Sequence, residues 1–115
     1  YHGNTSSLID ISPYKYQGKG GRGPGPYTHK AMLPDLFRGP IKNGKKRAGS
    51  EYANSVSNII NKLDSLNKKP AAFMCESLPG CGGQILLPDG SWSDHLPEWR
   101  KSDRCLSANT SIPFR

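Results

Sequence analysis

Residues 50–83 read SEYANSVSNIINKLDSLNKKPAAFMCESLPGCGG and contain the elements that decide the fold. The first half has apolar side chains at i, i+4, i+7, i+8, i+11 and i+14, a spacing that brings them to one face of an α-helix. These side chains are Tyr52, Val56, Ile59, Ile60, Leu63 and Leu66. Ser50 can cap this helix, the lysines at 68 and 69 suit its carboxyl end, and Pro70 is expected to stop it. The pattern predicts one helix over 50–69.

The apolar run AAFMC at 71–75 has no alternation, which is typical of a strand buried on both faces of a parallel sheet. A helix, a buried strand and a glycine-rich turn form half of a βαβ unit, so the predicted fold class is α/β. Glu76 follows this strand at its carboxyl end, where open parallel sheets bind ligands. It could equally cap the amides of the turn, and both interpretations stay open. Residues 85–87 could add a short extended piece.

Two cysteines flank this acid. Cys75 and Cys81 are too far apart in sequence for a Cys-x-x-Cys clip, and no histidine lies nearby to complete a zinc site. No neighbouring base would activate either thiol, so we predict neither a metal site nor a nucleophile, and we expect Cys75 to pack as a small apolar side chain. An odd number of three cysteines favours a reducing, cytoplasmic location over a disulfide-linked one.

The chain before the helix is less regular. Residues 5–14 predict about two turns of helix, capped by Thr5 or Ser6 and ended by Pro13. Residues 15–49 have no period and form a long Gly/Pro loop. The glycines at 18, 20 and 23 satisfy G-x-G-x-x-G, but prolines follow where a helix should begin, so a loop is predicted in place of a dinucleotide site.

Composition limits the core and the partners. Only 34% of the 115 residues are hydrophobic, and 13 Gly and 10 Pro leave room for a small core alone. The net charge of +7 concentrates in 14–47, which carries nine Lys or Arg and one acid, Asp35. This segment lacks interleaved aromatics and a recognition helix, so a nucleic-acid partner is disfavoured.

No apolar stretch reaches the roughly 20 residues of a membrane helix. The tail 91–115 has no period and is expected to be poorly ordered.

Three segments together resemble one enzyme family. YHGNT at 1–5, IDISPYK at 9–15 and AAFMCESLPGCGGQILLPDG at 71–90 are similar to class III pyridoxal-phosphate-dependent aminotransferases. The similarity is strongest to the alanine–glyoxylate aminotransferase 2-like branch, which includes phosphoethanolamine phospholyases, and ESLPGCGGQI is the most specific motif. The resemblance covers 1–90 and implies a partial large domain of fold-type I, with a mostly parallel sheet between helices, in an enzyme that forms a homodimer.

The resemblance also implies four cofactor-binding residues. Tyr1 matches an aromatic side chain that stacks on the pyridine ring of pyridoxal 5'-phosphate, His2 and Gly3 complete this motif, and Glu76 lines the cofactor region. Many relatives have a second acid five residues after this glutamate. Here Cys81 stands at that position, which puts ordinary 2-oxoglutarate chemistry in doubt.

The residues that perform the chemistry in this family have no match here. The phosphate-binding segment is expected before Tyr1, and the aspartate for the pyridinium nitrogen and the Schiff-base lysine are expected beyond residue 90, where Lys101 lies in the unmatched tail. We therefore assign no catalytic residue and expect a fragment that is inactive alone. The intact parent would act on a small-molecule amine or amino acid with an oxo acid, or eliminate phosphate. Two alternatives remain: a small basic binding module, and a fragment that docks onto an intact subunit through the helix at 50–69.

Overall fold

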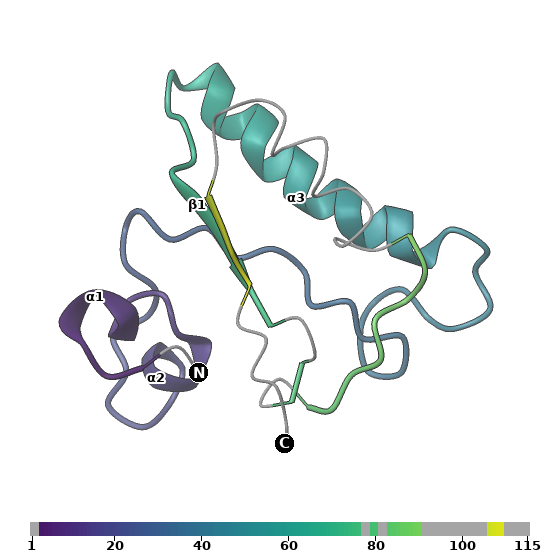
Figure 1. The fold of residues 1–115 in the computed structure, drawn as a ribbon, viewed down its shortest axis with the longest axis horizontal. Helices are drawn as coiled ribbons and strands as arrows, with labels where there is room; N and C mark the ends of the chain where they lie inside the picture. The colour runs from purple at the N-terminus through teal and green to yellow at the C-terminus, as the bar shows by residue number, and fades with distance from the viewer. Residues whose placement is uncertain (1–2, 77–78, 81–82, 91–105, 110–115) are drawn as a thin grey trace. The chain divides into compact units, whose positions relative to one another are not determined.

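The computed structural model describes residues 3–76, 79–80, 83–90 and 106–109, and the rest of the chain is drawn as a thin grey trace in Figure 1. The chain divides into two compact units, Tyr1–Lys30 and Ala31–Arg115. The first contains helices α1 (Ser6–Ile9) and α2 (Pro13–Tyr16). The second contains helix α3 (Ala48–Ser65) and strands β1 (Ala72–Cys75) and β2 (Leu106–Asn109).

The first unit has two short helices where the sequence predicted one. Thr5 is the N-cap of α1, as expected, although its side chain makes no capping hydrogen bond. The prediction that Pro13 ends the helix is wrong, because Pro13 is the first residue of α2. Proline suits this position, since it has no N–H to leave unpaired and its fixed φ is already helical.

Asp10, between the two helices, holds the following loop. Its backbone oxygen accepts hydrogen bonds from the N–H of Gly25 (2.9 Å) and the hydroxyl of Thr28 (3.3 Å). Its carboxylate accepts a 2.8 Å bond from the hydroxyl of Tyr27. The G-x-G-x-x-G motif follows α2 and leads into this loop without a helix, as predicted, with Gly20 and Gly23 at φ of +81° and +82°.

Helix α3 confirms the strongest sequence prediction but has different ends. It begins at Ala48 after the N-cap Arg47, so Ser50 lies inside the helix and does not cap it. It ends at Ser65, five residues before Pro70. The end is a Schellman motif: Asn67 adopts φ +54°, its N–H donates to the oxygen of Asp64, and the next N–H donates to the oxygen of Leu63. A left-handed asparagine therefore stops the helix before the lysines.

The apolar face of α3 builds a small core. Tyr52, Val56 and Leu63 are buried, whereas Leu66 is 56% exposed because it stands at the C-cap, past the last helical turn. A cluster of Ile41, Ala48 and Tyr52, with Leu36 packed against it, forms the centre of this core. None of the helices in the described ranges is long and apolar enough to cross a membrane.

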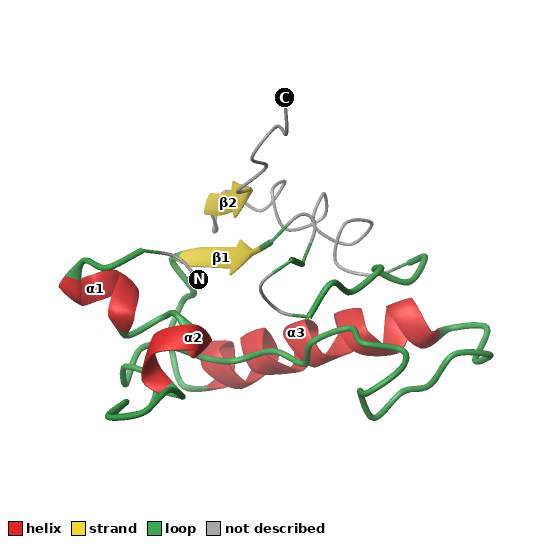
Figure 2. Ribbon diagram, turned by 90° about the horizontal axis from the view of Figure 1, so that it is seen from below, coloured by secondary structure: helices red, strands yellow, loops and turns green. Residues whose placement is uncertain are grey.

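The predicted strand is confirmed, and its neighbour is parallel to it. β1 pairs with β2 in register from Ala72 opposite Leu106 to Cys75 opposite Asn109, and Figure 2 shows the two strands side by side. A helix followed by a strand in a parallel pair is compatible with the predicted α/β class. The prediction of burial on both faces is wrong for this chain, because Ala72 is exposed and residues 73–75 are half-buried.

Two further predictions concern the chain after β1. Residues 85–87 form no strand: Ile85 is buried, but Leu86 is 82% exposed. β2 lies within 91–115, where the sequence predicted no element. The poor order expected of that tail stays a prediction, since 91–105 and 110–115 lie outside the described residues.

Candidate functional site

Glu76 is the candidate site residue that the structure places most clearly. It follows the last residue of β1 directly, so it lies at the carboxyl end of a strand that has a parallel neighbour. Its side chain is half-buried. Parallel sheets bind ligands at this edge. The predicted position of Glu76 at the carboxyl end of a strand is confirmed. Its role as ligand contact or turn cap stays a prediction.

After Glu76, backbone hydrogen bonds join the described residues 79–80 to the described residues 83–85, and so make a turn. The N–H groups of Gly83 and Gln84 both donate to the oxygen of Gly80 at 3.2 Å, and the N–H of Ile85 donates to the oxygen of Pro79 at 3.0 Å. Pro79 and Ile85 are buried. Gly83 and Gln84 have φ of +122° and +55°, so two successive residues occupy the left-handed region and reverse the chain.

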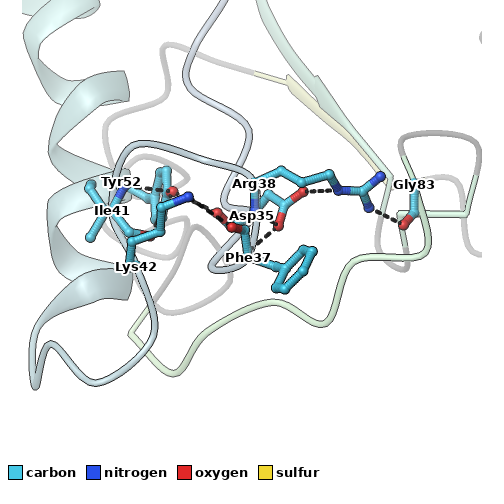
Figure 3. Close-up of polar contacts among 7 residues, drawn as sticks. All are labelled: Asp35, Phe37, Arg38, Ile41, Lys42, Tyr52 and Gly83. Carbon is cyan, nitrogen blue, oxygen red and sulfur yellow. Dashed lines mark hydrogen bonds and ion pairs between the residues drawn. The ribbon is translucent and has the colours of Figure 1, made fainter.

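Arg38 attaches this turn to an earlier loop. Its Nη2 donates a 2.8 Å hydrogen bond to the backbone oxygen of Gly83, 45 residues away in sequence (Figure 3). A Cβ atom at position 83 would lie 2.8 Å from the same Nη2, too close for the guanidinium to stay. The backbone conformation at 83 therefore favours glycine, and a Cβ there would displace the flexible end of the Arg38 side chain.

Asp35 holds Arg38 in this position. Its Oδ2 accepts a 2.9 Å bond from Nε of Arg38, and its Oδ1 accepts 2.9 Å bonds from the backbone N–H groups of Phe37 and Arg38. The Arg38 N–H is the largest cause of a lowered Asp35 pKa, and the Phe37 N–H and the guanidinium charge add to it against the opposing effect of burial. The carboxylate is thus held ionised although Asp35 is buried.

Tyr52 connects the same loop to helix α3. Its hydroxyl can donate to the backbone oxygen of Asp35 at 2.9 Å or to that of Ile41 at 3.0 Å. The same hydroxyl accepts a 3.2 Å bond from the backbone N–H of Ile41. Gly39 leaves the space for this bridge, because a Cβ there would overlap both the oxygen of Asp35 and the tyrosine hydroxyl. The loop, the helix and the turn after Glu76 are therefore bonded to one another.

Sequence reasoning missed this network. It treated 14–47 as a basic segment, whereas several of its charges hold the loop. Besides Arg38, Lys42 donates a 2.8 Å bond to the oxygen of Phe37, and Lys45 lies 3.7 Å from the carboxylate of Glu51. A signal was present: the order Asp35-Leu-Phe-Arg38-Gly is typical of a turn in which an aspartate accepts bonds from following N–H groups.

The other predicted cofactor residues are placed less fully. Tyr1 and His2 lie outside the described residues. Gly3 has φ +113°, and a Cβ there would lie 3.0 Å from Cδ1 of Leu8, so the local backbone alone demands glycine. Gly3 belongs to the first unit and Glu76 to the second.

Cys75 agrees with its predicted structural role. It is half-buried, and burial raises the pKa of its thiol, which disfavours the reactive thiolate. Cys81 lies outside the described residues. Where the structure describes the chain, no three His, Cys, Asp or Glu side chains gather as metal ligands.

Comparison with known proteins gives two curated relatives. The chain is 38% identical over 93 residues to "Alanine--glyoxylate aminotransferase 2-like" of Drosophila melanogaster, a match that covers 78% of this chain and 19% of that protein. It is 32% identical over 103 residues to "Ethanolamine-phosphate phospho-lyase homolog 1" of Caenorhabditis elegans, covering 82% of this chain and 22% of that protein. The chain thus spans about a fifth of the length of these relatives. No family model matches it. Both names belong to the branch predicted from the motifs, so that prediction is confirmed.

Proposed function

We propose that this chain, a homologue of alanine–glyoxylate aminotransferase 2-like and ethanolamine-phosphate phospho-lyase proteins, is a segment of a pyridoxal-phosphate-dependent enzyme of that kind. The observation that carries the proposal is an identity of 38% over 93 residues. Residues 1–90 would belong to the large domain of a class III, fold-type I enzyme. The position of Glu76 at the carboxyl end of a parallel strand supports this assignment.

The described residues are compatible with the cofactor. Glu76 is a half-buried acceptor at the ligand-binding edge of a parallel strand pair. In the whole enzyme we assign the stacking contact on the pyridine ring to Tyr1, the completion of that motif to His2 and Gly3, and the pocket wall to Glu76. When bound, the cofactor would withdraw electrons from the substrate carbon that carries the amine. The residues assigned here bind and orient, and the catalytic lysine and aspartate would be supplied by other parts of the enzyme.

Two reactions fit these relatives. The whole enzyme would transfer an amine between an amino acid and an oxo acid, or eliminate phosphate from an amine that carries a phosphate ester. Cys81, at the position of the second acid of many aminotransferases, argues against ordinary 2-oxoglutarate chemistry and is compatible with both reactions. The homodimer and the cytoplasmic location belong to the same proposal.

We expect the 115-residue chain alone to be inactive, because no residue in 1–90 matches the Schiff-base lysine or the pyridinium-binding aspartate. The test uses the full-length protein beside this chain, each with pyridoxal phosphate. One assay measures phosphate released from ethanolamine phosphate, and the other measures pyruvate formed from alanine and glyoxylate. Activity of the full-length protein in either assay supports the function. A full-length protein that neither retains the cofactor nor acts in either assay contradicts it, and turnover by the isolated chain contradicts the expected inactivity.

A further inference from the structure

The loop that leads from Ile41 into helix α3 (Figure 1) contains the one Asn-Gly pair of the chain, Asn43-Gly44. Asparagine is a chemically labile residue, because the backbone nitrogen of the next residue can attack its side-chain carbon Cγ and close a five-membered succinimide ring. A following glycine makes this attack easiest, since it has no Cβ to obstruct the approach and its backbone is the most flexible. Every other asparagine of the chain precedes a residue with a side chain.

The two groups that would react already lie together. The backbone N–H of Gly44 donates a 2.9 Å hydrogen bond to Oδ1 of Asn43, so the asparagine side chain is folded back over the next peptide bond. Its Cγ, which carries Oδ1, therefore lies beside the nitrogen that would attack it. Gly44 belongs to a turn and has φ +96°, and a Cβ built there meets nothing within 4 Å. The ring can close in this open space without displacing a neighbour.

The surroundings of the pair supply water and positive charge. Residues 42–47 are all exposed, so water reaches the loop. The charged side chains of this stretch are all cations: Lys42, Lys45, Lys46 and Arg47. The attacking nitrogen must first lose its proton, and nearby cations favour the negatively charged form that results. Solvent screens these exposed charges, so they assist the reaction modestly and the approach of the two groups remains the main cause.

We propose that Asn43 is a site of spontaneous deamidation. The nitrogen of Gly44 forms a bond to Cγ of Asn43, the bond from Cγ to the side-chain amide nitrogen breaks, and this nitrogen leaves as ammonia with the proton that Gly44 has lost. Water then opens the succinimide. Opening between Cγ and the Gly44 nitrogen gives aspartate, and opening at the backbone carbonyl gives isoaspartate, in which the chain runs through the former side chain. Both products replace a neutral amide with a carboxylate in a basic segment.

The isoaspartate product lengthens the backbone just before α3. Ala48 is the first residue of this helix, and its N–H donates a 3.1 Å bond to the oxygen of Lys45. The N-cap, Arg47, makes no side-chain capping bond, so the start of the helix depends on the path of residues 44–47. We expect isoaspartate to loosen the first turn of α3, whereas aspartate, which keeps the normal backbone, should leave it intact.

The test follows the full-length protein by peptide mass spectrometry while it is incubated at physiological temperature. Deamidation is read from the mass gain of the peptide that contains Asn43, and electron-transfer fragmentation distinguishes isoaspartate from aspartate. We expect product at Asn43 to form about tenfold faster for each unit of rising pH, because the deprotonated fraction of the attacking amide rises by that factor. Asn58 and Asn61 are matched internal controls: they are also exposed but lie within α3, and they should stay intact.

Variants of the full-length protein test the geometry and its consequence. Gly44→Ala should slow the reaction by about tenfold or more, because a Cβ obstructs the attack. Gly20→Ala is its control: Gly20 also has a positive φ, +81°, and open space around it, and its replacement should leave the rate at Asn43 unchanged. Amide hydrogen exchange at Ala48 reports on the first turn of α3. It should be faster in the isoaspartate form and unchanged in Asn43→Asp.

Each contrary result overturns a stated part. An Asn43 that stays intact in the folded protein but reacts in the urea-unfolded protein shows that the fold protects it, and the proposal fails. Equal rates at Asn43, Asn58 and Asn61, or a Gly44→Ala variant as fast as the wild type, overturn the role of the Asn-Gly geometry. Unchanged exchange at Ala48 in the isoaspartate form overturns the effect on α3 alone. These readouts need neither cofactor nor turnover, so they decide independently of the proposed function.

Discussion

Replacing Tyr52 by Phe removes one oxygen atom from a side chain that has no exposed surface. The aromatic ring stays, so the packing of the core is nearly unchanged. The hydroxyl donates one bond, to the oxygen of Asp35 or of Ile41, and its loss costs about 1 kcal/mol. The N–H of Ile41 loses its bond to this hydroxyl, and a buried donor without a partner costs a further ~1–3 kcal/mol. We expect Tyr52→Phe to lower the free energy of unfolding by about 2–4 kcal/mol.

Urea denaturation followed by circular dichroism measures this change, provided that the slope with denaturant is the same in both proteins. Tyr27→Phe is the matched control. Its hydroxyl also makes one hydrogen bond, to Asp10, but the side chain is 60% exposed, so we expect a change within about 0.5 kcal/mol. If the two substitutions have equal effects, Tyr52 is not the buried bridge between helix and loop, and the reasoning is refuted.

Three further predictions concern single residues. Gly39→Ala should lower the free energy of unfolding by about 3 kcal/mol, since the new Cβ overlaps the backbone oxygen of Asp35. Gly44→Ala, where the Cβ meets open space, should lower it by about 1 kcal/mol through backbone strain, and thermal unfolding measures both changes. Asn67→Ala should destabilise the protein by about 1 kcal/mol, because Asn67 ends α3 at a φ of +54° that alanine rarely adopts. Asn61→Ala, within α3, should stabilise it by roughly 0.5 kcal/mol, and changes in unfolding free energy of the same sign in denaturant titrations would contradict this prediction. The neighbouring donors lower the pKa of Asp35 in the folded protein, so its ionised form stabilises the fold. This stabilisation is complete above the pKa of the unfolded chain, about 3.9, and is lost as the pH falls through the lower pKa of the folded protein. Asp35→Asn should therefore flatten the acid limb of the stability profile, and an unchanged limb would argue against the ion pair.

Helix α3 and strand β1 could be predicted because their signals are local. The apolar spacing from Tyr52 to Leu63 specifies one helical face, and the unbroken apolar run after Pro70 specifies a strand. The ends of α3 were harder to predict. Both Asn67 and Pro70 can stop a helix, and the hydrogen bonds that decide for Asn67 appear only in the folded backbone.

The network behind the candidate site could not be predicted, because it depends on long-range contacts. Arg38 meets Gly83 across 45 residues, and Tyr52 meets Asp35 across 17. A pattern of charges cannot show which arginine makes such a contact. Conversely, the place of Glu76 at the end of a strand was predicted from the apolar run before it, and family resemblance suggested its role.

The central claim, that this chain is a segment of a pyridoxal-phosphate enzyme, is tested most directly by locating the cofactor-bound lysine. The full-length holoprotein is reduced with borohydride, digested and mapped by mass spectrometry. The account predicts one pyridoxyl-modified lysine, in a peptide outside these 115 residues. A protein with no pyridoxyl-modified lysine, or one modified within this chain, would contradict the account.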